Sequence, residues 1–161
     1  MNIDVLIEMS MGTSHIKYEV DHKTGVLRFD RFLHTSMHYP CNYGCLPNTI
    51  GGDNDAVDVL VITPYPLIPN CNVLCNVIGV LHMVDESGDD PKILAVPVDE
   101  VYSDWYDIID VPIEQLESMY HFFEHYKDLD ENKWAKVNGW GDNSEAKRVI
   151  DDGIYRYNNR C

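Results

Sequence analysis

The sequence predicts an α+β domain, in which a small and mostly antiparallel sheet or barrel is packed against helices. Short runs rich in β-branched and aromatic residues fill the first two-thirds of the chain, and helical spacing of apolar residues appears only in the last third. The length of 161 residues, without a linker or an internal repeat, is that of one domain. We therefore expect a single domain over residues 1–161.

Strands are expected at several places in the first two-thirds of the chain. Residues 15–20 and 26–33 flank a polar turn at 21–25, an arrangement typical of a hairpin. Residues 35–57 contain two prolines and three glycines and are expected to form a long ordered loop, which in a compact domain is usually functional. The other expected strands are 5–9, 57–64, 92–98 and 71–85, the last with a bend at Gly79.

Two helices are expected in the last third. The first begins at Pro112, a residue that suits the first turn of a helix, and its apolar stripe consists of Leu116, Met119, Tyr120, Phe123 and Tyr126. The second begins near Asp142, whose side chain can cap the helix while Glu145 completes a capping box. Its apolar stripe consists of Ala146, Val149, Ile150, Ile154 and Tyr157.

The charge balance excludes some classes of function. The chain has 12 Lys and Arg against 27 Asp and Glu, a net charge of −15, which disfavours binding to nucleic acid or to an anionic membrane. No apolar run approaches the roughly 20 residues of a membrane span, and the N-terminus lacks the features of a signal peptide. The odd count of five cysteines, without a secretion signal, favours the cytoplasm and free thiols.

The repeated C-x-x-x-C spacing raises zinc binding as an alternative. Cys71 and Cys75 lie in a predicted strand, where residues four apart are separated by about 13 Å. Two thiolates on one zinc ion must each lie about 2.3 Å from it. We therefore expect the cysteines to be small buried side chains.

The densest chemical cluster is Asp53, Asp55 and Asp58, just before an apolar strand. Three carboxylates this close repel one another, and oxygen-only ligands favour hard cations such as Mg²⁺ or Mn²⁺; an acidic solvated turn is the alternative. An EF-hand is excluded because the sixth and twelfth positions are Asp58 and Pro64 instead of Gly and Glu. A phosphoaspartate nucleophile is excluded because the apolar strand follows the motif instead of preceding it.

A second acidic group spans Asp85–Asp90 and is followed by Lys92. Alone it is typical of a solvated hairpin turn, but aspartates from two strand ends could jointly hold two or more metals, as two-metal hydrolases require. Lys17 and Glu19 face one side of a predicted strand. Lys, Arg and Tyr side chains are good donors to phosphate oxygens, and a chain this acidic must bring cations with it if its substrate is a polyphosphate.

Six segments together resemble the soluble family I inorganic pyrophosphatases of the short bacterial type. They are IKYEVD, GVLRFDRFL, YPCNYG, DNDAVDVLV, GVLHMVDESGDDPKILAVP and HFFEHYKDLDENKWAKVNGW. The resemblance runs from about residue 3 to the last helix. It implies a five-stranded OB-like barrel with two main packed helices, and hydrolysis of pyrophosphate to two phosphates.

By motif position, the resemblance implies several Mg²⁺ ions per active site, with Mn²⁺ or Zn²⁺ as substitutes. The activating metal is assigned to Asp53, Asp58 and Asp90, and a metal that arrives with the substrate to Asp85 and Asp90. Glu19 contacts another metal, and Asp55 is the general base on the bridging water. Phosphate binding is assigned to Lys17, Arg31, Tyr43, Lys92, Tyr126 and Lys127, and Glu8 aligns with a further active-site carboxylate.

The resemblance also implies a homo-oligomer, a hexamer, with His121 and His125 near subunit contacts. Asn54 and Ala56 depart from the family, which commonly has Gly and Pro there, and Ser10 stands where Pro is frequent. One alternative is a non-catalytic OB-like module for oligonucleotide or sugar, opposed by the net charge and by the lack of a basic groove with stacking aromatics. The other is a metal-dependent hydrolase of a nucleotide or a longer polyphosphate.

Overall fold

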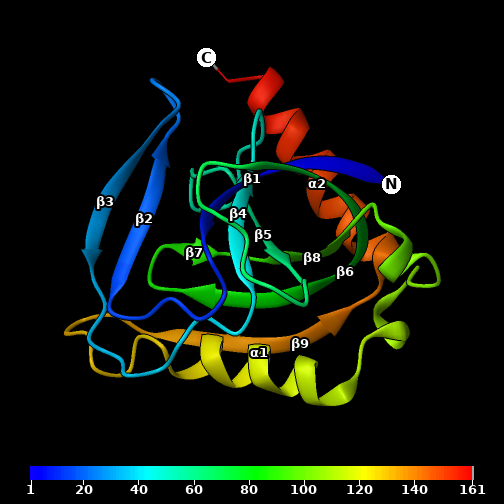
Figure 1. The fold of residues 1–161 in the computed structure, drawn as a ribbon. Helices are drawn as coiled ribbons and strands as arrows, with labels where there is room; N and C mark the ends of the chain where they lie inside the picture. Colours follow the sequence, from blue (N-terminus) through cyan, green and yellow to red (C-terminus); the bar gives the residue numbers. More distant parts are fainter. Residues whose placement is uncertain (161) are drawn as a thin grey trace.

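A closed five-stranded barrel forms the centre of the protein in the computed structural model, which describes residues 1–160 (Figure 1). Its strands are β1 (Asn2–Met9), β4 (Asn42–Leu46), β5 (Val57–Val61), β8 (Lys92–Pro97) and β6 (Asn72–Asp85). The order β1–β4–β5–β8–β6 returns to β1, so no barrel strand has a free edge. Strands β5 and β8 pair in parallel and the other barrel neighbours are antiparallel. The predicted α+β class and OB-like barrel are confirmed.

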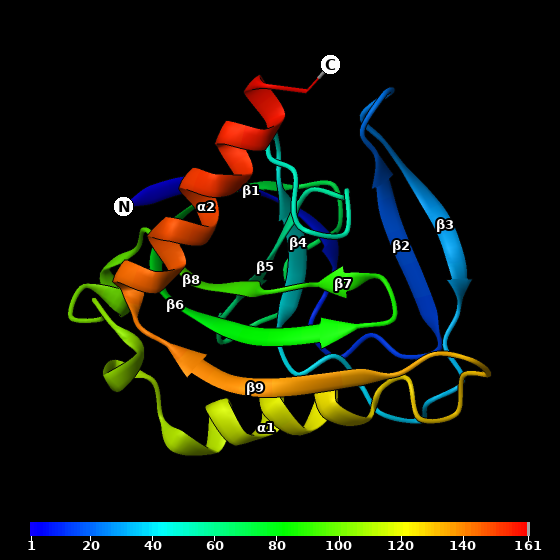
Figure 2. The same ribbon diagram turned by 180° about the vertical axis from the view of Figure 1, so that it is seen from behind.

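Three strands, one of them only two residues long, lie where none was predicted. Strand β4 occupies part of the expected loop at 35–57. All five of its residues are buried, so it lacks the alternation of apolar and polar residues that marks a strand with one solvent-exposed face. Strand β9 (Ala135–Gly141) interrupts the expected all-helical last third and pairs with β6 outside the barrel (Figure 2). A two-residue strand, β7 (Gly88–Asp89), pairs with the end of β6.

The predicted hairpin is confirmed as a separate two-stranded sheet. Strand β2 (Ile16–Asp21) pairs with β3 (Val26–Phe32), and neither belongs to the barrel sheet. Both ribbon views show the hairpin standing beside the barrel (Figures 1 and 2). One link between them is the Val20 N–H, which donates to Glu8 Oε1 on β1 at 2.7 Å.

Both predicted helices are confirmed. Helix α1 (Ile113–His125) starts directly after Pro112, and α2 (Asn143–Asn158) is capped by Asp142, with the capping box to Glu145 formed in both directions. Two single turns, η1 (Glu100–Tyr102) and η2 (Ile108–Asp110), precede α1. The buried stripes differ slightly from those expected, since α1 buries Phe122 and α2 buries Gly153 while Tyr120 and Ile154 are exposed.

The two helices cover two apolar clusters built largely on barrel residues. One cluster places Phe122 and Phe123 of α1 with Leu60 and Leu94 of the barrel, and the other places Ile150 of α2 with the inner residues of β1 and β5. No helix within residues 1–160 is long and apolar enough to cross a membrane. The four cysteines among these residues, Cys41, Cys45, Cys71 and Cys75, are free, and Cys161 lies outside the described residues.

Candidate active site

An acidic pocket of about 300 Å³ lies between the hairpin and the β5, β6 and β8 side of the barrel. Its lining contains eight carboxylates, Glu8, Glu19, Asp53, Asp55, Asp58, Asp85, Glu86 and Asp90, and five Lys or Arg side chains, Lys17, Arg31, Lys92, Lys127 and Lys133. Every site residue named from the sequence lines this one cavity, including Tyr43 and Tyr126. Glu8 and Lys133, which are 125 positions apart in the chain, therefore meet at one place.

Lys92 is the central cation of the pocket. The parallel register of β5 and β8 puts it opposite Asp58, and its ammonium donates to Asp58 Oδ2 at 2.7 Å and to Asp90 Oδ2 at 2.8 Å. It also donates to the Tyr43 hydroxyl at 3.3 Å, while being only 1% exposed. A lysine is buried this deeply only when it is paired, so both carboxylates are needed to keep it in place.

The Lys92 ammonium is shared by Asp58 and Asp90, but the pKa values of these two carboxyl groups differ. Burial alone would raise the pKa of Asp58, but the Lys92 ammonium and hydrogen bonds from Lys92 and Tyr43 hold that pKa below its usual range. Burial raises the pKa of Asp90 to about 7, with Lys92 opposing it and Asp58 adding to it. Asp58 is therefore ionised at neutral pH, and Asp90 gains most from additional positive charge.

Lys127 plays the same part for Asp85 and Glu86. Its ammonium donates to Asp85 Oδ2 at 2.9 Å and to Glu86 Oε1 at 3.2 Å. Burial works against ionisation of Asp85, but the bonds from Lys127 and from the Ser87 N–H lower its pKa. Glu86 was not identified from the sequence, although its position beside Asp85 in the acidic turn was a usable signal.

The loop between β4 and β5 is held in shape by its own backbone. The Gly51 N–H donates to the Asp55 carbonyl at 2.6 Å, and the Asp55 N–H donates to Asp53 Oδ1 at 3.1 Å. Asn54 adopts φ +72°, a left-handed conformation that Asn tolerates and Gly adopts at no cost. Asp55 is consequently exposed at the tip of the loop while Asp53 and Asp58 are partly covered.

Two glutamates complete the acidic lining where the hairpin meets the barrel. Burial raises the pKa of Glu8 to about 8, although the hydrogen bond from the Val20 N–H opposes the shift. Burial also raises the pKa of Glu19, with Lys17 lowering it and Asp30, Asp55 and Asp58 raising it. Both groups are therefore costly to ionise until another cation enters the pocket.

These carboxylates fit divalent cations that are shared with a substrate. Among residues 1–160, no three His, Cys, Asp or Glu side chains are close enough to form a ready-made metal site. Mg²⁺, however, usually binds through one or two carboxylates together with waters and substrate phosphate oxygens. Carboxylates spread around a 300 Å³ pocket, several with pKa values raised by burial, suit that mode of binding.

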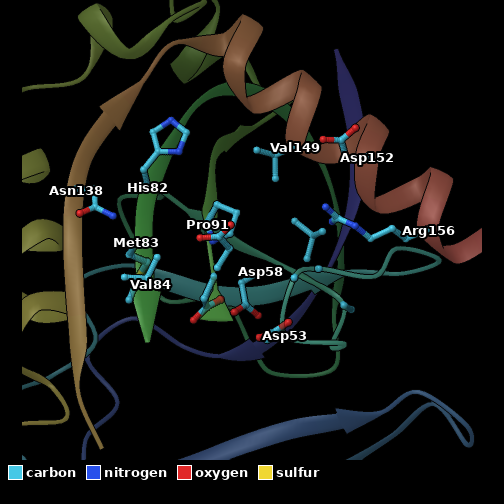
Figure 3. Close-up of a pocket in the computed structure, with 16 residues that line it drawn as sticks. Asp53, Asp58, His82, Met83, Val84, Pro91, Asn138, Val149, Asp152 and Arg156 are labelled. Carbon is cyan, nitrogen blue, oxygen red and sulfur yellow. The ribbon is translucent and has the colours of Figure 1, made fainter. Parts of the chain in front are cut away.

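A second cavity of about 310 Å³ lies on the other side of the same loop (Figure 3). It shares Asp53, Asp58 and Asp90 with the acidic pocket, and His82 of β6 and Arg156 of α2 contribute to its far walls. The β4–β5 loop therefore separates the acidic pocket from the second cavity. Helix α2 supports this loop through a hydrogen bond in which the Ile50 N–H donates to the Gly153 carbonyl at 3.0 Å.

Comparison with known proteins gives consistent results over nearly the whole chain. The family model for inorganic pyrophosphatase matches residues 5–158. The inorganic pyrophosphatase of Xanthomonas axonopodis pv. citri is 49% identical over 159 residues, covering 97% of this chain and 89% of that protein. The inorganic pyrophosphatase structure from Coxiella burnetii has a TM-score of 0.93 at 43% identity, covering 97% and 95% of the two chains. That from Thermus thermophilus has a TM-score of 0.92 at 38% identity, covering 98% and 92%.

Proposed function

The chain belongs to the inorganic pyrophosphatase family, and we propose that its acidic pocket hydrolyses pyrophosphate to two phosphates with bound Mg²⁺ and with Asp55 as the general base. The observation that carries this proposal is the convergence of eight carboxylates and five Lys or Arg side chains in one pocket. Pyrophosphate is highly anionic, so its binding requires the basic side chains. The carboxylates become useful only when cations accompany the substrate.

The basic side chains are distributed on two facing walls. Lys17 and Arg31 belong to the hairpin, while Lys92 and Lys127 belong to the barrel side, with Tyr43 and Tyr126 beside them. Ammonium, guanidinium and phenol groups all donate to phosphate oxygens. A substrate with two phosphoryl groups can therefore be held from both sides, which positions it for attack and stabilises charge on the leaving phosphate.

The metal assignments are those implied by motif position in the family. Asp53, Asp58 and Asp90 would hold the activating Mg²⁺, Asp85 and Asp90 the ion that arrives with the substrate, and Glu19 a further ion. When bound, Mg²⁺ supplies neutralisation of the substrate charge and lowers the pKa of a coordinated water. Mn²⁺ and Zn²⁺ are proposed substitutes, and Glu8 is a further active-site carboxylate.

Asp55 is proposed as the base because it differs from its neighbours. It is exposed at the loop tip, forms no ion pair with a Lys or Arg of residues 1–160, and lies between the two proposed ligands Asp53 and Asp58. Asp58 and Asp90, in contrast, each form an ion pair with Lys92. An exposed carboxylate is free to accept a proton from the attacking water.

A phosphate-release assay tests the proposal. Protein freed of metal with a chelator should be inactive on pyrophosphate and should recover with added Mg²⁺. Parallel assays with tripolyphosphate and ATP, each with Mg²⁺, test the alternative of a broader polyphosphate or nucleotide hydrolase. Substantial turnover of pyrophosphate without any divalent ion would refute the metal assignment.

We also propose a homo-oligomer, a hexamer, in the cytoplasm. An apolar groove on the outer face of α1 supports the assembly, since it is lined by Ile113, Leu116, Tyr120, His121, His125 and Trp140 with two glutamates. Four free cysteines support the location, because disulfides are rare in reducing compartments.

A further inference from the structure

A third cavity, of about 430 Å³, lies beside the acidic pocket, and three segments form most of its walls. The turn of the β2–β3 hairpin forms one side, the residues just after β4 form another, and the C-terminal end of α2 with the residues that follow it forms the third. Figures 1 and 2 both show the hairpin turn and the end of α2 at the same end of the molecule. The cavity shares only His22, Cys45 and Ala56 with the acidic pocket.

The charge of this cavity is opposite to that of the protein. Its lining includes Lys23, Arg160 and His22 but no Asp or Glu, whereas four other cavities formed by residues 1–160 each include at least one. Within residues 1–160, neither the Lys23 ammonium nor the Arg160 guanidinium forms an ion pair. This local basic lining favours an anion, although the net charge of the chain is −15.

The interior of the cavity is apolar. Val20, Cys45 and Ala56 are buried together and pack against Leu6, and all four residues line the cavity. At the rim, the Arg160 guanidinium lies 3.8 Å from the centre of the Tyr157 ring, which restricts its orientation. A pocket with an apolar interior and a few charged groups at its edge binds a ligand that has an apolar body and a charged end.

We propose that this cavity is a binding site for a small organic phosphate, distinct from the substrate pocket. The phosphate group lies between Lys23 and Arg160, and the organic group lies on the surface formed by Leu6, Val20, Cys45 and Ala56. Lysine donates as a point charge and the guanidinium donates through a planar fork, so the two together suit a phosphate with several oxygens. Asn48 and Asn54 supply further polar groups around it.

The test is the binding of phenylphosphonate, a phosphate-ester mimic that is not hydrolysed, to the full chain after removal of metal with a chelator and dialysis. Isothermal titration should show one saturable site. Because a hydrogen bond to a charged group is lost in each case, Lys23→Gln and Arg160→Gln should each weaken binding roughly tenfold. Lys147→Gln and Arg148→Gln are the matched controls, since they remove the same charges from exposed positions of α2 outside the cavity, and they should change the affinity less than about twofold by the screening of exposed charges.

Three results would overturn the proposal. Equal losses in the cavity variants and the controls would show a general charge effect. Loss of binding in Arg31→Gln, with Lys23→Gln and Arg160→Gln unaffected, would place the ligand in the substrate pocket. If inorganic phosphate or methylphosphonate bound as tightly as phenylphosphonate, the apolar interior would not contribute to the affinity.

Discussion

At the scale of single residues, the pocket is organised by lysines that each serve more than one carboxylate. Lys92 holds Asp58 and Asp90, and Lys127 holds Asp85 and Glu86. Removing one partner of a buried pair leaves an uncompensated charge, which costs about 3–5 kcal/mol. These lysines therefore stabilise the empty pocket in addition to their proposed contacts with phosphate.

The Asp55→Asn variant tests the proposed base. The change keeps the size of the side chain and one acceptor oxygen but removes the negative charge that accepts a proton. Since general-base contributions are about 10²–10⁴-fold, kcat for pyrophosphate should fall by that order. Metal titrations of the reaction rate should show that saturating Mg²⁺ leaves the defect in place.

Asp58→Asn is the comparison for that experiment. Asp58 is a proposed ligand, so its variant should chiefly lose affinity for Mg²⁺ and should improve at high Mg²⁺. If high Mg²⁺ restored kcat of Asp55→Asn to near the parent value, Asp55 would be a ligand and the base would have to be sought elsewhere.

Glu8 predicts a pH dependence of stability in the metal-free protein. Its pKa is raised from an ordinary 4.5 to about 8 in the folded state, so the native state binds the extra proton and its stability falls as pH rises through that window. The effect is at most about 1.4 kcal/mol per pH unit. Glu8→Gln, which stays neutral and keeps an acceptor for the Val20 N–H, should lose this slope. Urea unfolding at pH 5 and pH 8 measures it, and an identical slope in parent and variant would contradict the assigned pKa.

At the scale of elements, α2 supports the loop that carries Asp53 and Asp55. Gly153 lies where α2 meets this loop, and a methyl group added there would lie 2.8 Å from Val57 Cγ2 and 3.3 Å from Thr49 Cβ. Thr49 in turn accepts a hydrogen bond from the Val57 N–H at 2.9 Å. The close approach of the helix therefore depends on the absence of a side chain at position 153.

Gly153→Ala should consequently destabilise the protein. In an exposed helix the change stabilises by about 1 kcal/mol, but overpacking costs typically 1–3 kcal/mol. We expect a net loss in urea unfolding and a weaker response of activity to Mg²⁺. Ser144→Ala, at an exposed position of the same helix, is the control. If the variant instead gained about 1 kcal/mol in the free energy of unfolding, the loop would accommodate the added methyl group without strain.

Local patterns predicted the hairpin, both helices and the Asp142 cap, because each is specified by residues close in sequence. Strand β4 could not be found this way, since it is buried on both faces and carries no alternation. The side chains of the pocket were identified from motif position, but the contact of Lys92 with Asp58 depends on a parallel register between β5 and β8. That register is set by closure of the barrel and is not encoded in either segment alone.

At the scale of the whole molecule, the groove along α1 predicts the assembly. Light scattering should give a mass of six copies of the 18.5 kDa chain. Ile113 is 60% exposed and lines the groove, so Ile113→Lys would put a charge into an apolar contact and should lower the mass. Ile109, 87% exposed and outside the groove, gives the control Ile109→Lys. A monomer at micromolar concentration in the parent protein would contradict the hexamer.

The separate sheet of the β2–β3 hairpin has a consequence for the order of events in turnover. Lys17 and Arg31 lie on the hairpin and Lys92 and Lys127 on the barrel side. Under the proposed phosphate contacts, we expect a ligand with two phosphoryl groups to bind both pairs and a single phosphate to bind only one of them. Cleavage of the substrate is therefore expected to remove the link between the hairpin and the barrel, so we predict that departure of the product is coupled to release of the hairpin. Amide hydrogen exchange in residues 16–32 should slow when an uncleaved diphosphate analogue is bound and return to its free rate with monophosphate.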